Sequence, residues 1–283
     1  MSDNQINVLA RNIPYEGEKM RLLVAKLQTV EYREALEIQQ RLLRLRQQGA
    51  IEDTLLLLEH PSVITIGRGG DEEHVVASPQ FLQQQDVQIY KTNRGGDVTY
   101  HGPGQIVGYP VVDLRQQTRD VHDFIRKIEE IFIRLLQCEY GIAATRDAEH
   151  RGVWVGESKI VAVGCAIKRW VSMHGFAFNV NTRLESFAWI IPCGIHDKGV
   201  TSLQELVGRP CNVAEVTDQV CCYFADTFQM QLEVIERAEL YRMIGGEPDG
   251  YSPAKLDQSK YESAERHGAG SHDYAQAVSP HHL

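Results

Sequence analysis

Residues 121–139 form an amphipathic segment that must pack against a core. Apolar side chains recur there at spacings of three and four residues, which is the period of an α-helix. Asp120 precedes the segment and suits an N-cap, and Gly141 follows close to its end. The apolar face comprises Phe124, Ile125, Ile128, Ile131, Phe132, Leu135 and Leu136.

Apolar runs predict strands on both sides of this helix. Three of them follow one another after the helix, and residues 156–158 suit a tight turn between the first two. Pro110 lies in an earlier run, where it indicates an edge strand or a bulge. The predicted strands cover 54–59, 63–66, 106–114, 152–155, 160–169 and 171–180.

Further helices are predicted from periodicity and capping signals. One covers 31–48 and ends before Gly49, and another runs from an Asn212 cap to about Gln229. Ser202 opens a capping box with Glu205 that predicts a short helix. Residues 81–90 fit neither pattern clearly. With 43% hydrophobic residues in 283, the chain is expected to form a single α/β domain with extensions.

The two ends of the chain differ from the rest in composition. Residues 1–19 are polar and are expected to form a poorly ordered lead-in. Residues 245–283 contain few large aliphatic side chains, so burial cannot offset their ordering entropy and disorder is expected. The folded domain is therefore placed at 20–244. A protein ending near Arg242 is expected to fold.

Charge and hydropathy exclude some classes of function. A net charge of −9 argues against a surface devoted to nucleic acid. Apolar runs fall short of the ~18 residues that a membrane span needs, and no apolar signal segment stands at the N-terminus. The protein is expected to be cytoplasmic, with neither a nucleic acid nor a membrane as partner.

One of the six cysteines is placed differently from the others. Cys193 lies between Pro192 and Gly194, which indicates an irregular, sharply turned backbone where a thiol can meet a substrate. A loop cysteine is nevertheless more often inert, because reactivity requires a lowered pKa. Most of the remaining cysteines suit small buried hydrophobic positions; they are Cys138, Cys165, Cys211, Cys221 and Cys222.

Residues 94–105 form a glycine-rich stretch with a cation and an imidazole. Paired glycines allow a backbone to approach a ligand closely, Arg94 suits a carboxylate or phosphate, and His101 can transfer a proton. A glycine-rich hairpin that binds nothing is the alternative, and composition alone favours it. Similarly, Lys159 fits a solvated strand end, and His174 fits a hydrogen-bonded core position as well as a functional one.

Taken together, these stretches resemble the lipoyl(octanoyl) transferase family. The resemblance covers roughly residues 20–235 and rests on several separate motifs. The family signature R-G-G-x-x-T-x-H-x-x-G-Q-x-x-x-Y matches at Arg94, Gly95, Gly96, Thr99, His101, Gly104, Gln105 and Tyr109. Segments 159–164, 173–177, 192–195 and 200–203 also resemble the family in order and spacing.

The resemblance implies a mixed sheet with packed helices, as in the catalytic domains of biotin and lipoate ligases. It implies an acyl-enzyme mechanism with Cys193 as nucleophile, Lys159 as its activating partner and His174 in a supporting role. The acyl pocket, with Val163 and Phe176 in its apolar lining, would be formed by Arg94, Gly95, Gly96, Asp97, Val98, Thr99, Tyr100, His101, Ala162, Val163, Gly164, Gly175, Phe176 and Ala177.

The resemblance also implies the partners. Octanoyl-acyl carrier protein would be the donor, and lipoyl domains of 2-oxoacid dehydrogenases and the glycine cleavage H protein would be acceptors, with no cofactor and no metal. Three alternatives stay open at this stage. They are an ATP-dependent lipoate or biotin ligase, a non-catalytic carrier of lipoyl or octanoyl groups, and a cysteine hydrolase that pairs Cys193 with His174 or His196.

Overall fold

The computed structural model describes residues 20–191 and 198–246. The chain divides into two compact units, Met1–Pro248 and Asp249–Leu283, and all described residues belong to the first unit. The predicted lead-in at 1–19, Cys193 and the predicted tail beyond Gly246 lie outside the described residues.

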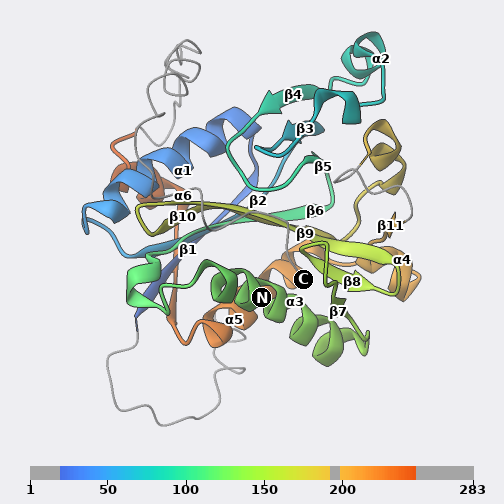
Figure 1. The fold of residues 1–283 in the computed structure, drawn as a ribbon. Helices are drawn as coiled ribbons and strands as arrows, with labels where there is room; N and C mark the ends of the chain where they lie inside the picture. The colour runs from blue at the N-terminus through green and yellow to red at the C-terminus, as the bar shows by residue number, and fades with distance from the viewer. Residues whose placement is uncertain (1–19, 192–197, 247–283) are drawn as a thin grey trace. The chain divides into compact units, whose positions relative to one another are not determined.

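A mixed nine-stranded sheet forms the centre of the described part of the chain (Figure 1). Its order is β12-β1-β2-β6-β10-β9-β8-β7, and β11 pairs with β9. β1 runs parallel to β2 and β12, whereas β6 and β10 pair antiparallel with their neighbours. The strands are β1 (Arg21–Thr29), β2 (Asp53–Glu59), β6 (Gln105–Val111), β7 (Thr145–Arg146), β8 (Val153–Val155), β9 (Ser158–Lys168), β10 (Val171–Asn179), β11 (Gly199–Val200) and β12 (Gln231–Ile235).

A second, three-stranded sheet lies beside one part of the large sheet (Figure 1). β3 (Val63–Ile66) is its central strand, parallel to β4 (Gln88–Lys91) and antiparallel to β5 (Val98–His101). The ambiguous segment 81–90 splits between α2 (Pro79–Gln84), which Ser78 caps, and β4.

Helices cover both faces of the large sheet. α1 (Tyr32–Gln47) and α6 (Arg237–Met243) lie on one face, and α3 (Val121–Tyr140) and α5 (Val213–Thr227) lie on the other (Figure 1). The remaining helical segments are α4 (Leu203–Val207) and the 3₁₀ turns η2 (Glu72–His74), η3 (Leu114–Gln116) and η4 (Leu184–Trp189). Within the described ranges, no helix combines the length and the apolar character that a membrane crossing needs.

The predicted caps of these helices are confirmed. The Asp120 carboxylate accepts hydrogen bonds from the backbone N–H groups of His122 and Asp123, and Gly141 ends α3 with a φ of 66°. Asn212 caps α5 in the same way, and the Ser202 hydroxyl accepts from Glu205 N. These caps satisfy donors that the first turn of a helix leaves without partners.

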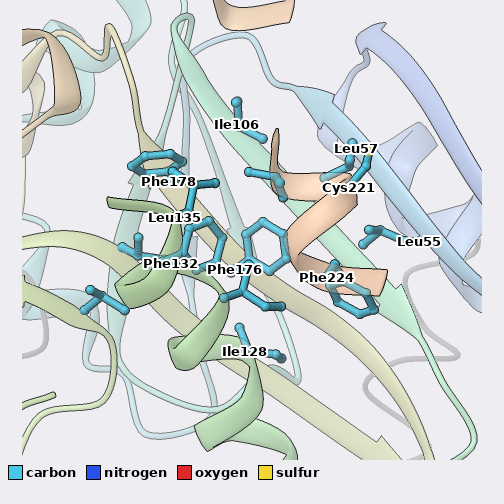
Figure 2. Packing of buried hydrophobic residues seen from close by; sticks show 14 of the residues in the cluster. Leu55, Leu57, Ile106, Ile128, Phe132, Leu135, Phe176, Phe178, Cys221 and Phe224 are labelled. Carbon is cyan, nitrogen blue, oxygen red and sulfur yellow. The ribbon is translucent and has the colours of Figure 1, made fainter. Parts of the chain in front are cut away.

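The core between the sheet and α3 centres on a pair of aromatic rings. Phe132 of α3 packs edge-on against Phe176 of β10, with ring centroids 4.8 Å apart (Figure 2). The Phe176 ring occupies the space above Gly108 of β6, where a Cβ atom would lie 2.0 Å from it. A glycine at 108 is therefore required for this packing.

Pro110 corrects one part of the strand prediction. It lies in β6 between β2 and β10, so it is not at a sheet edge. The regular register between β6 and β10 covers 105–108 and has ended before Pro110. The missing N–H group of proline is tolerated beside this interruption of the ladder.

Candidate active site

The signature loop, residues 92–97, contains the first residues of the family signature and passes from the small sheet to the large sheet. Residues 92–97 connect β4 to β5, and Gly95 N donates a hydrogen bond of 2.9 Å to Cys165 O of β9. A Cβ atom at Gly164 would lie 2.9 Å from Gly95 O. The two backbones are therefore in direct contact, and glycine permits this approach.

Arg94 braces this loop against the small sheet. Its Nε donates to Thr65 Oγ1 at 3.0 Å, and its Nη2 donates to Thr65 O at 2.7 Å and to Asp97 O at 2.6 Å. The side chain is buried. These bonds differ from the predicted binding of a carboxylate or phosphate, because the guanidinium group holds backbone oxygens of its own chain.

Small residues of β9 and β10 form a patch on the sheet face opposite α3. Ala162 pairs with Ala177 and Gly164 pairs with Gly175, so the four lie side by side. The signature loop packs over this patch through the Gly95–Gly164 contact. The structure thus brings the three segments of the predicted acyl pocket together.

The side chains of Val163 and Phe176 point away from that patch, which corrects the predicted apolar lining. Both pack into the core beside α3, because neighbouring side chains along a strand alternate between its two faces. A hollow of about 240 Å³ lies elsewhere, between α2 and β4, and none of the predicted site residues lines it.

A chain of buried hydrogen bonds joins the signature to the far side of the site. His101 Nδ1–H donates to Gln105 Oε1 at 2.7 Å, and Gln105 Nε2 donates to Asn179 Oδ1 at 2.9 Å. Asn179 Nδ2 donates to Thr201 O at 3.0 Å, and Thr201 N donates to Lys159 O at 3.0 Å. These hydrogen bonds connect the ring of His101 to the backbone of Lys159. The linked residues, and those that hold them in place, form the frame of the site.

Burial keeps the histidines of this frame neutral. Loss of solvation lowers the pKa of His101 and of His174 to about 3, with the nearby charge of Arg94 acting in the same direction. His174 Nε2 bonds Asn93 Oδ1 at 2.7 Å, so His174 supports the start of the signature loop. Neither ring is suited to carry a proton near neutral pH.

Lys159 is buried rather than solvated, in contrast to the alternative of an exposed strand end. Residue pairing shifts from Val153–Val161 to Trp154–Lys159, so Ile160 is an extra residue that forms a bulge in β9. Ile160 and Val161 both enter the core beside α3, which turns Lys159 to the opposite face. Its Nζ lies 4.7 Å from the centre of the Trp154 ring.

The described residues that flank 192–197 are hydrogen-bonded to other parts of the chain. Before it, Ile191 N donates to His74 O at 2.8 Å. After it, β11 pairs with β9, with Gly199 opposite Ser158 and Val200 opposite Lys159. The described residues thus bring the chain that follows Cys193 directly beside Lys159.

Four of the other cysteines carry thiols that are not activated, whereas Cys138 of α3 is exposed rather than buried, contrary to the prediction for it. Burial raises the pKa of Cys165 and of Cys221 to about 12. Burial also raises the pKa of Cys211 and Cys222 above the ordinary value. These thiols are protonated near neutral pH and are poor nucleophiles.

Sequence reasoning missed three residues of this frame, namely Thr65, Trp154 and Asn179. Thr65 is the one polar residue of β3, and Asn179 ends the apolar stretch of β10; a polar residue in such a setting was the available signal. Trp154 gave no signal, because an aromatic residue in a short strand is ordinary core material.

Comparison with known proteins assigns a family to this fold and site. Residues 31–225 match the model of the lipoyl protein ligase A/B catalytic domain. The chain belongs to the lipoyl protein ligase A/B family.

Within that family, the chain is similar to proteins named octanoyltransferase. It is 50% identical to the one from Desulforamulus reducens over 228 residues, which is 81% of this chain and 100% of that protein. It is 52% identical to the one from Caldicellulosiruptor bescii, covering 78% of this chain and 97% of that protein. The predictions of the family and of an acyltransferase are confirmed.

Solved structures support the fold. A lipoate-protein ligase A bound with ATP superimposes with a TM-score of 0.64 at 17% identity, covering 82% of this chain and 97% of that one. A putative lipoate protein ligase of T. acidophilum with bound lipoic acid gives the same TM-score and identity, over 80% and 92%. The predicted mixed sheet of the ligase-like catalytic domain is confirmed.

Proposed function

We propose that this protein transfers an octanoyl (or lipoyl) group from acyl carrier protein to a lysine of a lipoyl domain. The acyl group passes through a thioester on Cys193, and Lys159 assists both steps. The observation that carries the proposal is the pairing of β11 with β9, which brings the chain following Cys193 beside the buried Lys159.

The first half-reaction moves the acyl group from one sulfur to another. The Cys193 thiolate attacks the thioester carbonyl of octanoyl-acyl carrier protein, a new C–S bond forms and the old C–S bond breaks. The carrier thiolate leaves and takes a proton from the ammonium group of Lys159, which is then neutral for the next step. Exchange between thioesters is nearly isoenergetic, so no ATP is consumed. A free cysteine has a pKa of about 8.5 and is only slightly ionised near neutrality, so the ammonium group of Lys159 contributes by favouring the thiolate.

The second half-reaction forms an amide. The amine of the acceptor lysine attacks the Cys193 thioester, a C–N bond replaces the C–S bond, and the thiolate of Cys193 is regenerated. The attacking amine must lose a proton, which Lys159 accepts when it is neutral. An amide is much more stable than a thioester, so this step drives the transfer.

The relatives named octanoyltransferase support this activity over that of a ligase, a carrier or a hydrolase. They are identical to this chain at about half of the aligned positions. ATP-dependent ligases share the fold at 17% identity, which carries no substrate assignment. The proposal assigns lipoyl domains of 2-oxoacid dehydrogenases and the glycine cleavage H protein as acceptors. The reaction is assigned to the cytoplasm, with no nucleic acid and no membrane taking part.

Intact-protein mass after incubation with octanoyl-acyl carrier protein tests the thioester. The wild-type protein should gain one octanoyl group without ATP, and peptide mapping should place it on Cys193. Cys193→Ala should gain none and should not transfer, whereas the matched control Cys165→Ala should react normally because its thiol is inert. An adduct on Cys165 or Cys211, or a requirement for ATP, would overturn the proposal.

Two variants of Lys159 separate its electrostatic role from its role in proton transfer. Lys159→Met should shift the pH profile of Cys193 alkylation by iodoacetamide to higher pH, because the stabilising cation is lost. Lys159→Arg should keep the alkylation profile, since guanidinium stays protonated, but should stall discharge onto the lipoyl domain. An unchanged alkylation profile in Lys159→Met would show that this lysine does not act on the thiol.

A further inference from the structure

The ammonium groups of two lysines lie against one buried tryptophan ring near the start of β9. Lys159 Nζ lies 4.7 Å and Lys198 Nζ lies 5.0 Å from the centre of the Trp154 ring. At these distances the electron-rich face of an indole attracts an ammonium group. Trp154 is only 3% exposed, so water competes little for this contact.

The Trp154 ring is held in place by the connection between β7 and β8. Trp154 stands directly opposite Lys159 in the β8–β9 pairing, and its Nε1–H donates to His150 O at 3.1 Å. Glu129, a buried carboxylate of α3, accepts from Gly152 N at 3.0 Å and from Arg146 Nε at 3.1 Å. The connection between β7 and β8 is thus fixed to α3 at both of its ends.

Lys198 is held by the same connection. Its ammonium group forms an ion pair with Asp147, whose Oδ1 also accepts from the backbone N–H groups of Glu149 and His150. These bonds, led by the one with Lys198, hold the pKa of Asp147 well below its usual range. Lys198 therefore has an anionic partner in Asp147, and the indole ring of Trp154 lies against the ammonium groups of both lysines.

We propose that Trp154 is a positioning residue for Lys159, holding its ammonium group at the reacting centre through the face of the indole ring. The inference rests on the proposed function of Lys159 in acyl transfer. A lysine side chain has four flexible methylene groups, and an ammonium group without a fixed contact would sample several rotamers. A preset position shortens the search for the reactive geometry in both half-reactions.

Fluorinated tryptophan tests the contact without removing the ring. The chain contains three tryptophans, so Trp170 and Trp189 are first replaced by phenylalanine, leaving Trp154 as the labelled site. Monofluoro- and trifluorotryptophan are then incorporated, because fluorine withdraws electron density from the ring face and changes its shape little. The rate of Cys193 acylation by octanoyl-acyl carrier protein should fall stepwise, by about 3-fold to about 30-fold in all.

Alkylation of Cys193 by iodoacetamide supplies a readout that a merely structural role would not change. In the protein with Trp170 and Trp189 replaced by phenylalanine, fluorination should shift the pH profile of alkylation to higher pH. In a Lys159→Met version of that protein it should have no effect, because the cation that the ring holds is absent. An effect of equal size with and without Lys159 would overturn the positioning role.

The outcomes also separate this inference from the proposed function. If the unfluorinated protein gains no octanoyl group on Cys193, the proposed function fails. If it is acylated and fluorination leaves both the rate and the alkylation profile unchanged, the positioning role alone fails. Melting temperatures of the fluorinated proteins within about 2 °C of the parent exclude misfolding as the cause, since a 1 kcal/mol change shifts a domain of this size by about 2–4 °C.

Discussion

At the scale of single residues, the site combines a buried lysine with histidines that stay neutral. His60 donates from Nδ1 to Val30 O at 2.6 Å and accepts from the Tyr109 hydroxyl at Nε2 at 2.7 Å. Burial lowers its pKa to about 4, and the same cause lowers the pKa of His101 and His174 to about 3. Protonating any of these rings would place a charge in a site with little water.

These lowered pKa values predict that acid destabilises the fold. Each ring binds a proton near pH 6.5 when unfolded but only near pH 3–4 when folded, so its stabilising contribution is complete above pH 6.5. That contribution is lost as the pH falls from 6.5 toward the folded pKa, about 4 for His60 and about 3 for His101 and His174. Between pH 6.5 and pH 5 the free energy of unfolding from urea titrations should fall by about 1–2 kcal/mol for each ring.

The variant His174→Asn tests the contribution of one ring to this pH dependence. His174 has a φ of 55°, and asparagine adopts that backbone conformation readily, so His174→Asn preserves the main chain. It should reduce the proton uptake on unfolding at pH 5 by about one proton. Equal uptake in His174→Asn and the wild type would show that His174 is protonated in the folded protein at that pH.

At the scale of elements, the hairpin between β9 and β10 carries backbone strain. Arg169 and Trp170 connect the two strands with φ values of 51° and 66°. A two-residue turn with positive φ at both positions is type I′, which favours Asn-Gly. Side chains other than those of glycine, asparagine or aspartate make this conformation unfavourable.

Replacing this turn should therefore stabilise the protein. The double variant Arg169→Asn with Trp170→Gly should raise the free energy of unfolding by about 1 kcal/mol, measured by urea titration. Trp170 is 40% exposed, so the loss of its side chain offsets only part of the gain. Lys168→Asn, one residue earlier in the strand, is the control and should bring no gain. Stability equal to that control would contradict the strain.

The elements differ in how far the sequence alone predicts them. Helix ends at Asp120 and Asn212 were predictable, because a cap is a hydrogen bond to residues two or three positions away. β1 was not assigned from the sequence. It is parallel to both β2 and β12, so partners distant in the chain decide that it is a strand. Pro110 was predicted to lie at an edge or a bulge because the sequence does not show which strands flank β6 in the sheet.

At the scale of the whole molecule, the same limit applies to the site. The signature loop and its partner strand were predictable as motifs, since each is contiguous in the chain. The relay from Gln105 through Asn179 to Thr201 and the contact of Lys159 with Trp154 are tertiary contacts. The side-chain direction of Lys159 depends on the bulge at Ile160, which changes the alternation of β9. Sequence motifs thus predicted the candidate site residues, and packing determines the geometry of those that the structure describes.

The end of the domain also depends on packing; from the sequence it was placed at residue 244, and a protein ending near Arg242 was predicted to fold. Ile244 lies beyond that point and is 7% exposed, and Arg41 Nη1 donates to its carbonyl oxygen at 3.3 Å. Within α6, Leu240 and Tyr241 are almost fully buried, and the Tyr241 hydroxyl bonds the carboxylate of Glu34 in α1. A protein that ends at Arg242 would lose the Ile244 contacts.

Two truncations should therefore behave differently. A protein ending at Gly246 should keep its melting temperature within about 2 °C, because 247–283 contain few large apolar side chains and so contribute little burial. A protein ending at Glu236 should melt at least about 5 °C lower, since removing Leu240, Tyr241 and Ile244 exposes core worth several kcal/mol at about 1.5–3 kcal/mol per buried side chain. Differential scanning calorimetry measures both. A large loss already at Gly246 would mean that the C-terminal residues pack on the domain, and the expectation of a disordered tail would be wrong.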